Sequence, residues 1–190
     1  MPSLPPIVLD SSVDSADRTS AIDFINRVNL LFDAGDIDAM VEAFLPDSTT
    51  FHTQGITHGQ TEMRRFFQQA QPYSGPGVSR IATNPIVDAD DDGEGVVVRY
   101  HNLLVRYSAE TPSSVVTGQV QETPEDLPAI WVYCAMTDRL RRHGSGWRIF
   151  ERYIGTTTMN DRLRPPASGA SYVDAYRRPS AAALPRQLVF

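Results

Sequence analysis

An arginine, a histidine and a tyrosine recur on one side of a segment near the middle of the chain. Residues 96–107, VVVRYHNLLVRY, are rich in β-branched and aromatic residues, which is typical of a β-strand. Because successive side chains of a strand point to opposite faces, Arg99, His101 and Tyr107 share one face. Two polar groups on a half-apolar face suit a pocket better than a plain core. The alternative is a satisfied core histidine beside a salt-bridged arginine.

These residue types support proton transfer on a carbonyl compound. An imidazole titrates near neutrality and can move a proton in either direction. An arginine supplies fixed positive charge where an enolate or alkoxide develops, and a tyrosine can donate a hydrogen bond there. The set predicts metal-free dehydration, isomerisation or ring closure.

Length and charge exclude several other classes of protein. A chain of 190 residues fits one domain with tails. The net charge of −6 argues against nucleic acid as a partner. All 17 basic residues are arginines, and the missing lysine amine excludes Schiff-base and P-loop chemistry.

The single cysteine, Cys134, rules out an internal disulfide and suits a reducing cytoplasm. It lies in an apolar run and is expected to be a small core residue rather than a nucleophile. No segment has the length of a membrane span, and residues 1–6 do not resemble a signal peptide. No His or Cys spacing matches a metal site, so neither metal nor cofactor is expected.

Hydrophobic periodicity predicts helices in the first half of the chain and strands in the second. The first helix is expected to begin at a cap on Thr19 or Ser20, and the second at Asp36. The second helix should run to Phe44 and be closed by the proline and aspartate after it. A third helix is expected at 60–71, after a turn at 55–59, and strands at 48–53, 78–87, 96–107, 129–142 and 147–156. This order predicts an α+β fold with helices on one side of a curved sheet.

Two stretches of the sequence resemble a known superfamily. They are residues 32–40, FDAGDIDAM, with Phe44 and Asp47 beyond, and residues 146–152, GWRIFER. Both resemble the nuclear-transport-factor-2-like superfamily, in the branch of SnoaL-like cyclases, scytalone dehydratase and dioxygenase β subunits. The resemblance implies a cone-shaped antiparallel sheet and three helices that enclose a pocket, with dimers commonly formed through the sheet.

The resemblance also implies which residues face the pocket and divides the chain. The domain would span 19–157, between a flexible arm at 1–18 and a tail at 158–190. In this interpretation His101 is the acid/base, Asp33 orients it or is the alternative base, and Arg99 and Tyr107 stabilise an oxyanion. The expected substrate-binding residues are Phe32, His52, Leu103, Val105, Cys134, Met136, Asp138 and Arg152. The expected ligand is an apolar, oxygenated ring compound of the kind found in secondary metabolism.

Several alternatives remain open. Asp33 can be a helix-ending residue, and Asp138 with Arg152 or Arg99 an ordinary cross-strand ion pair. Arginine with aspartate also suits epoxide opening, as in limonene epoxide hydrolases. The protein can instead be a non-catalytic subunit like the dioxygenase β subunits.

Other surfaces carry their own expectations. The side chains of Arg139, Arg141 and Arg142 should form a solvated strand end. Apolar residues on both faces of the strands predict a homodimer through the sheet. The tail segment around 171–178 is expected to pack on its own domain or on the partner subunit, as a lid over the pocket.

Overall fold

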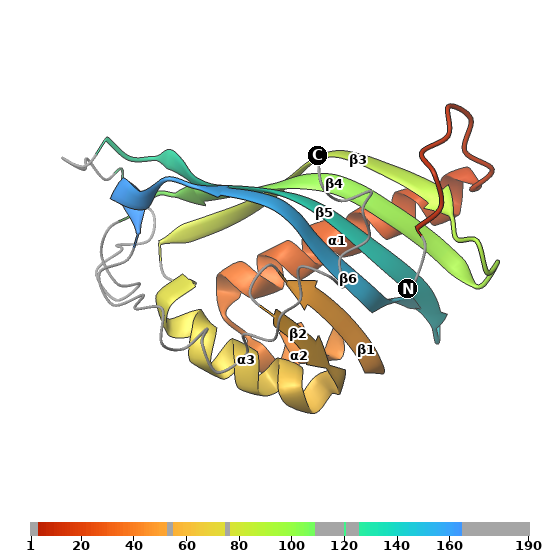
Figure 1. Ribbon diagram of the computed structural model, residues 1–190, viewed down its shortest axis with the longest axis horizontal. Helices are drawn as coiled ribbons and strands as arrows, with labels where there is room; N and C mark the ends of the chain where they lie inside the picture. Colours follow the sequence, from red (N-terminus) through yellow and green to blue (C-terminus); the bar gives the residue numbers. More distant parts are fainter. Residues whose placement is uncertain (1–3, 53–54, 75–76, 109–119, 121–125, 165–190) are drawn as a thin grey trace.

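The chain folds into a curved sheet with helices on one side, in a computed structural model that describes residues 4–52, 55–74, 77–108, 120 and 126–164. The sheet has six strands in the order β2-β1-β6-β5-β4-β3. Figure 1 shows α1 running beneath the long strands, with α2 and α3 beside β1 and β2. The predicted α+β architecture is confirmed.

The first helix, α1 (Ser15–Ala34), starts earlier than predicted because Asp14, and not Thr19 or Ser20, is its N-cap. The Asp14 carboxylate accepts a hydrogen bond of 2.8 Å from a backbone N–H of the first turn. Gly35 ends the helix with a φ of 71°, a left-handed conformation that favours glycine. The backbone N–H of Gly35 donates to the carbonyl oxygens of Leu31 and Phe32, which closes the helix.

Residues 37–74 form two helices and two short strands. The helix α2 (Ile37–Glu42) is capped by Asp36 as predicted, but it is shorter than expected because β1 (Phe44–His52) takes over the following residues. The predicted turn after β1 is a short strand, β2 (Gly55–His58), and α3 (Gly59–Ser74) follows it directly. This arrangement places the end of β1 against α3.

Four long strands complete the sheet, close to their predicted positions. They are β3 (Val78–Ala89), β4 (Gly95–Arg106), β5 (Ala129–His143) and β6 (Gly146–Met159), each antiparallel to the next. A short 3₁₀ helix, η2 (Asp161–Leu163), follows. The strand β1 pairs in parallel with β6, which joins the two halves of the chain in one sheet.

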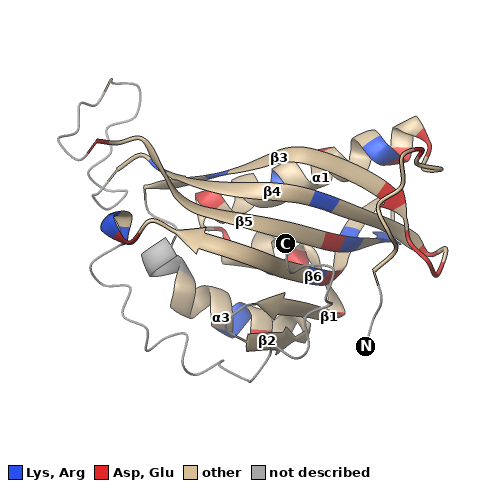
Figure 2. Ribbon diagram, turned by 45° about the horizontal axis from the view of Figure 1, so that its top comes forward, with Lys and Arg blue, Asp and Glu red and all other residues tan. Residues whose placement is uncertain are grey.

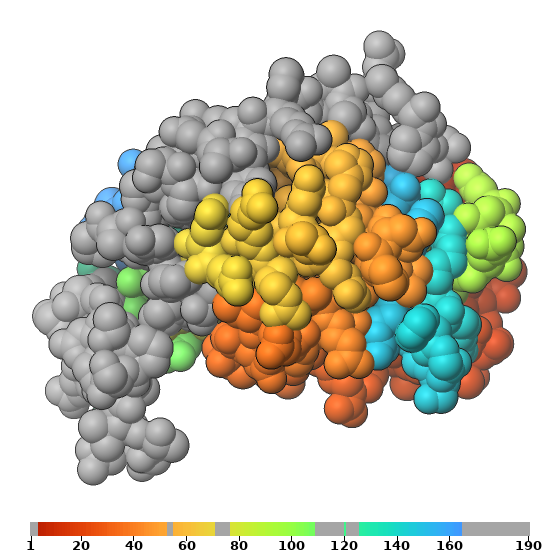
Figure 3. Space-filling model, turned by 90° about the horizontal axis from the view of Figure 1, so that it is seen from below, coloured from red at the N-terminus to blue at the C-terminus, as the bar shows by residue number. Residues whose placement is uncertain are grey.

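The main core lies between the sheet and the helices. It includes Ile25 and Val28 of α1, Phe67 of α3, Val96, Val98 and Tyr100 of β4, and Met136 and Leu140 of β5. Figure 3 shows the helical side, with α3 in yellow. We call the sheet face that packs on these helices the inner face, and the opposite one the outer face.

The outer face is covered in part by the N-terminal segment. Leu4 is 3% exposed and packs with Val97 of β4 and Tyr153 of β6. The described part of the predicted N-terminal arm therefore contacts the sheet. Two further predictions, a polar connection at 108–128 and a packed tail at 171–178, lie mostly or wholly outside the described residues.

Candidate functional site

A buried tyrosine, aspartate and arginine form a hydrogen-bonded network on the inner face. Strand pairing places Asp138 between Val98 on β4 and Arg152 on β6, so all three residues share one face. Arg152 Nε and Nη2 donate to Asp138 Oδ1 and Oδ2, each at 2.8 Å. The Tyr100 hydroxyl donates to Asp138 Oδ2 at 2.9 Å. Both carboxylate oxygens are therefore satisfied from within the protein.

The burial of this network determines its charges. Asp138 is completely buried, and Tyr100 and Arg152 are nearly so. Burial and the neighbouring Asp138 carboxylate raise the pKa of Tyr100 well above its ordinary value, so its hydroxyl stays protonated. Burial alone would lower the pKa of Arg152, but Asp138 and Tyr100 raise it above the usual value. The network thus places a fixed ion pair behind the inner face.

A second ion pair joins the end of α1 to β3. Arg80 donates to Asp33 Oδ1 from its Nη1 at 2.9 Å, and its backbone N–H donates to Oδ2, also at 2.9 Å. The Ser79 hydroxyl donates to the same carboxylate at 3.1 Å. The side chains of Arg80 and Asp33 are 10% and 17% exposed, so this pair is less enclosed than the first. Asp33 here anchors the helix end to the sheet and still reaches solvent.

The Phe32 ring lies close to both ion pairs. Its centroid is 5.5 Å from Arg80 Cζ and 5.8 Å from Arg152 Cζ, within cation–π range. Burial lowers the pKa of Arg80 although Asp33 opposes this, and the positive charge of Arg152 lowers it further. The guanidinium groups of Arg80 and Arg152 therefore both lie within cation–π distance of the Phe32 ring.

An aromatic row leads from Phe32 to His52. The Phe32 and Phe67 centroids are 5.0 Å apart, those of Phe67 and Phe66 are 5.9 Å apart, and His52 lies 6.1 Å from Phe66. Burial lowers the pKa of His52 to about 4, so its imidazole is neutral at pH 7. A neutral ring leaves one nitrogen able to accept a proton.

The predicted residues on β5 also lie on the inner face, and one of them is chemically quiet. Cys134 and Met136 are both buried. The Cys134 thiol donates to the Asn102 carbonyl oxygen at 3.6 Å, and Asn102 also accepts from the Asn29 amide at 3.2 Å. Burial raises the pKa of Cys134 to about 11, although Arg152 and Arg80 oppose this. Such a thiol is a packing group and not a nucleophile.

The prediction that Arg99, His101 and Tyr107 share the inner face is wrong. Strand β4 turns its even-numbered residues toward the helices, because Tyr100 pairs with Met136 across the sheet and both belong to the main core. The odd-numbered residues of β4, including Leu103 and Val105, consequently point to the outer face.

The three displaced residues have separate outer-face environments. Arg99 pairs with Asp88 at 2.8 Å and donates to the backbone carbonyl of Pro5. His101 lies 5.3 Å from the Tyr133 ring. Tyr107 follows the end of β4 and is 42% exposed. The side chains of Arg99 and His101 therefore lie on the face of the sheet opposite the helices.

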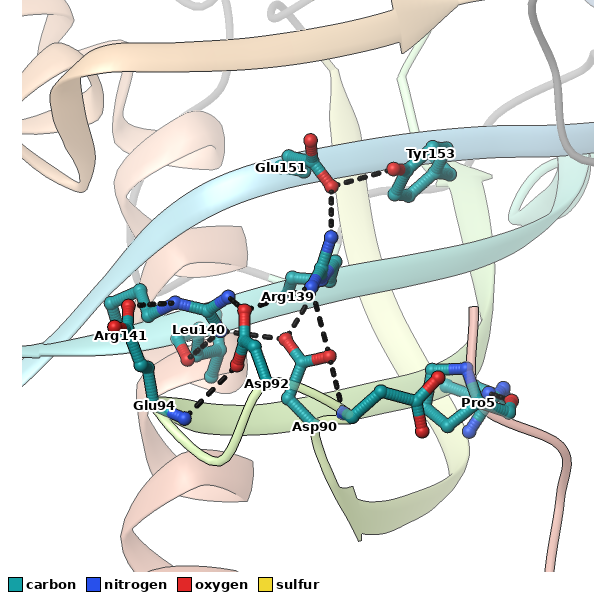
Figure 4. Close-up of polar contacts among 11 residues, drawn as sticks. Pro5, Asp90, Asp92, Glu94, Arg139, Leu140, Arg141, Glu151 and Tyr153 are labelled. Carbon is teal, nitrogen blue, oxygen red and sulfur yellow. Dashed lines mark hydrogen bonds and ion pairs between the residues drawn. The ribbon is translucent and has the colours of Figure 1, made fainter. Parts of the chain in front are cut away.

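A charged cluster on the outer face replaces the predicted solvated strand end. Arg139 and Arg141 both donate to Asp90, at 2.7 and 2.6 Å, from β5 to the β3–β4 turn. Arg139 also donates to Glu151 at 2.8 Å (Figure 4). Figure 2 shows acidic residues gathered at this turn. The two arginine side chains are only 10% and 9% exposed, so the cluster ties the hairpin to the sheet.

Sequence reasoning missed two inner-face residues, Tyr100 and Arg80. Tyr100 is adjacent to His101, so the same alternation that selected one residue excluded the other. Arg80 is the partner of Asp33, but no local spacing connects residues so far apart in sequence. The signal required was the cross-strand register for Tyr100, and the packing of α1 on β3 for Arg80.

Three searches of the described residues and of the sequence gave no result. Within the described residues, no three His, Cys, Asp or Glu side chains are grouped as metal ligands would be. No described helix is long and apolar enough to cross a membrane. A comparison with curated protein sequences gives no match.

Solved structures show the same fold at low sequence identity. An NTF2-like protein with a cystatin-like fold from Novosphingobium aromaticivorans is 18% identical, with a TM-score of 0.53, covering 83% of this chain and 88% of that one. A protein suggested to be a scytalone dehydratase, from the same organism, is 15% identical, with a TM-score of 0.56 and coverages of 80% and 93%. ActVI-ORFA from Streptomyces coelicolor is 13% identical, with a TM-score of 0.55 and coverages of 72% and 93%.

The sequence itself identifies the family. The model of the SnoaL-like domain matches residues 13–153, which is most of the chain and nearly all of the sheet and helices described above. Residues 32–40 and 146–152, which suggested this resemblance, both lie inside the matched region. The chain therefore belongs to the SnoaL-like domain family, within the NTF2-like fold.

Proposed function

We propose that the protein is a small-molecule enzyme of acid–base type, a dehydratase, isomerase or cyclase that acts on an apolar oxygenated ring compound. One observation carries the proposal: the Asp33–Arg80 pair is partly exposed on the inner face, beside the fully buried Asp138–Arg152 pair. Ionisable groups whose pKa values are shifted by burial and by specific charged partners cluster at functional sites. The likeness in fold to the suggested scytalone dehydratase supports this class of reaction.

The inner face supplies complementary roles for such a reaction. His52, neutral at pH 7, accepts or returns the proton, and Asp33 is the alternative base. The guanidinium groups of Arg80 and Arg152 stabilise the negative charge that develops on a carbonyl oxygen. The aromatic row from Phe32 to His52 gives an apolar ring a surface to lie on.

The experiment compares a histidine on each face of the sheet. The protein is incubated with bicyclic β-hydroxyketones, and the ultraviolet absorbance of the conjugated product is followed. His52→Gln and Asp33→Asn should each lower kcat/KM by about 100-fold or more. His101→Gln on the outer face is the matched control and should leave kcat/KM unchanged. Loss of activity in the control alone, or no turnover and no binding of any compound, would contradict the proposal.

A second candidate function is a non-catalytic assembly subunit, and the outer face favours it. Ile81, Leu103 and Tyr133 lie side by side across β3, β4 and β5 by strand register. Ile81 is 45% exposed and Tyr133 is 36% exposed, so this apolar row is open to a partner. We propose that a second copy of the chain covers it in a homodimer.

Light scattering tests the dimer. The native protein should have twice the mass of one chain at micromolar concentration, and Tyr133→Glu should convert it to a monomer. Leu30→Glu on α1 is the control, since Leu30 is 65% exposed away from the sheet. A native monomer, or a dimer that persists in the Tyr133 variant, would rule out this surface.

A further inference from the structure

Arg106, at the end of β4, is a buried arginine without an anionic partner. It is 6% exposed, and its Nη1 has no hydrogen-bond acceptor. No carboxylate among the described residues forms an ion pair with it. The other well-buried arginines of the sheet, Arg80, Arg99, Arg139, Arg141 and Arg152, each pair with an aspartate. Arg106 is therefore the exception among these buried arginines, and its lack of an aspartate partner needs an explanation specific to its position.

A second unsatisfied donor lies beside it. The Trp131 ring centroid is 5.7 Å from Arg106 Cζ, and the indole Nε1 is buried without an acceptor. The other tryptophan, Trp147, donates from its Nε1 to Ser20 Oγ at 2.9 Å. Buried donors are rarely left unsatisfied in native proteins, so two neighbouring ones indicate an acceptor that is not among the described residues.

The position of Arg106 connects it to the proposed ligand site. The register of β3 and β4 pairs Val78 with Arg106 and Arg80 with Leu104, so Arg106 shares the inner face with Arg80. Two residues along a strand correspond to about 7 Å. The surroundings are apolar, because Trp131 packs with Val78, Val132, Leu104 and Leu163.

A carboxylate is the acceptor that fits these groups. The guanidinium fork and the indole N–H are donors only, and neither can pair with the other. An apolar environment strengthens a charge-assisted hydrogen bond and makes the unpaired guanidinium costly. Burial accordingly lowers the pKa of Arg106, and no carboxylate among the described residues opposes this shift.

We propose that Arg106 and Trp131 bind a carboxylate group of the ligand, at the end of the inner face away from the Asp138–Arg152 pair. This inference rests on the proposed function, in which the inner face holds an apolar ring compound. It narrows the substrate class to multi-ring organic acids, with the acid group at Arg106 and the reacting oxygen nearer Arg80. Arg106 would bind and orient the substrate and take no part in proton transfer.

Binding of 2-naphthoate, compared with its neutral methyl ester, tests the site by calorimetry. The native protein should bind the acid at least tenfold more tightly than the ester. Arg106→Met should remove this preference, because the ring surface remains but the charge is lost. Arg148→Met, which removes a surface arginine paired with Glu42, is the matched control and should keep the preference.

Nuclear magnetic resonance gives a second measurement that does not depend on the folding of a variant. The chain has two indole N–H groups, and 2-naphthoate should shift the signal of Trp131 while that of Trp147 stays in place. The ester should leave both unchanged. Equal affinity for acid and ester, no binding of the acid, or a shift of Trp147 alone would overturn the proposal.

The outcome separates this site from the proposed enzymatic activity. A preference for the acid without turnover of any substrate upholds the Arg106 site and contradicts the enzyme. Turnover that depends on His52, with equal binding of acid and ester, upholds the enzyme and contradicts the Arg106 site.

Discussion

Arg152 on β6 donates to both carboxylate oxygens of Asp138 on β5, from Nε and Nη2, at 2.8 Å each. The aspartate side chain is 0% exposed and the arginine side chain 7% exposed, so neither charge is solvated by water. The Tyr100 hydroxyl donates to the same carboxylate. The pair therefore holds β4, β5 and β6 together at the centre of the inner face.

Asp138→Asn should destabilise the fold strongly, because it leaves Arg152 buried and unpaired. Removal of one partner of a buried pair costs about 3–5 kcal/mol. Urea denaturation of the variant should show this loss in the free energy of unfolding. Asp23→Asn breaks an exposed ion pair on α1 and should change stability by less than about 1 kcal/mol. Equal effects of the two changes would show that Arg152 finds another partner or solvent.

His52 should make the protein sensitive to mild acid. Its pKa is about 4 in the folded state, whereas an unfolded histidine has a pKa of about 6.5. The unfolded state therefore binds more protons below pH 6.5, so stability falls as the pH drops from 6.5 to 4 and this contribution then levels off.

Urea denaturation across this range measures the effect. His52→Gln should flatten the decline in the free energy of unfolding between pH 6.5 and pH 4. His143→Gln, in the exposed turn between β5 and β6, is the matched control and should retain the decline of the native protein. An unchanged slope in the His52 variant would mean that the imidazole is solvated.

The sequence was sufficient to predict the fold, because its signals were local. Asp36 marked a helix start, and runs of alternating apolar residues marked the four long strands. The boundaries that failed have local causes too: Asp14 is a better cap than the expected Thr19, since its carboxylate reaches the first turn.

The site could be predicted only in part, because alternation shows which residues share a face and not which face points to the helices. Both faces of β4 are apolar, with Val98 on one side and Val97 on the other, and both valines are fully buried. The decisive contact is the pairing of Tyr100 with Met136, which a single strand does not reveal. Asp138 and Arg152 lie on the inner face as expected, but their catalytic or binding role remains a prediction.

The acidic turn on the outer face should stabilise the protein at neutral pH. Burial alone would raise the pKa of Asp90, but hydrogen bonds from Arg139 and Arg141 hold it below its ordinary value. A lowered carboxyl pKa gives stability that is complete above the unfolded pKa of about 3.9 and is lost as the pH falls through the folded pKa.

Asp90→Asn should therefore lower the free energy of unfolding at pH 7 by several kcal/mol, in the range of about 3–5 kcal/mol for a broken buried pair. The difference from the native protein should begin to shrink below pH 4, where the carboxyl of the unfolded state becomes protonated while that of the folded state is still ionised. Denaturant titrations at pH 7 and pH 3 measure it. Asp47→Asn, at an exposed position of β1, is the control and should differ little at either pH. A constant difference at both values would argue against the charge as its cause.

The thiol of Cys134 should be almost unreactive in the folded protein. With a pKa of about 11, only about one thiol in a thousand is ionised at pH 8. An unfolded cysteine, with a pKa of about 8.5, is about one quarter ionised at this pH. Because the thiolate is the reactive form, labelling should be more than about 100-fold slower in the folded state, and burial of the side chain slows it further.

The rate of colour release from a disulfide reagent at pH 8 measures this reactivity. Cys134 is the single cysteine of the chain, so the rate reports on it alone. The reference is the protein unfolded in concentrated guanidinium chloride. Rapid labelling of the native protein would show that the inner face opens to the reagent at Cys134, and would make this thiol a candidate nucleophile.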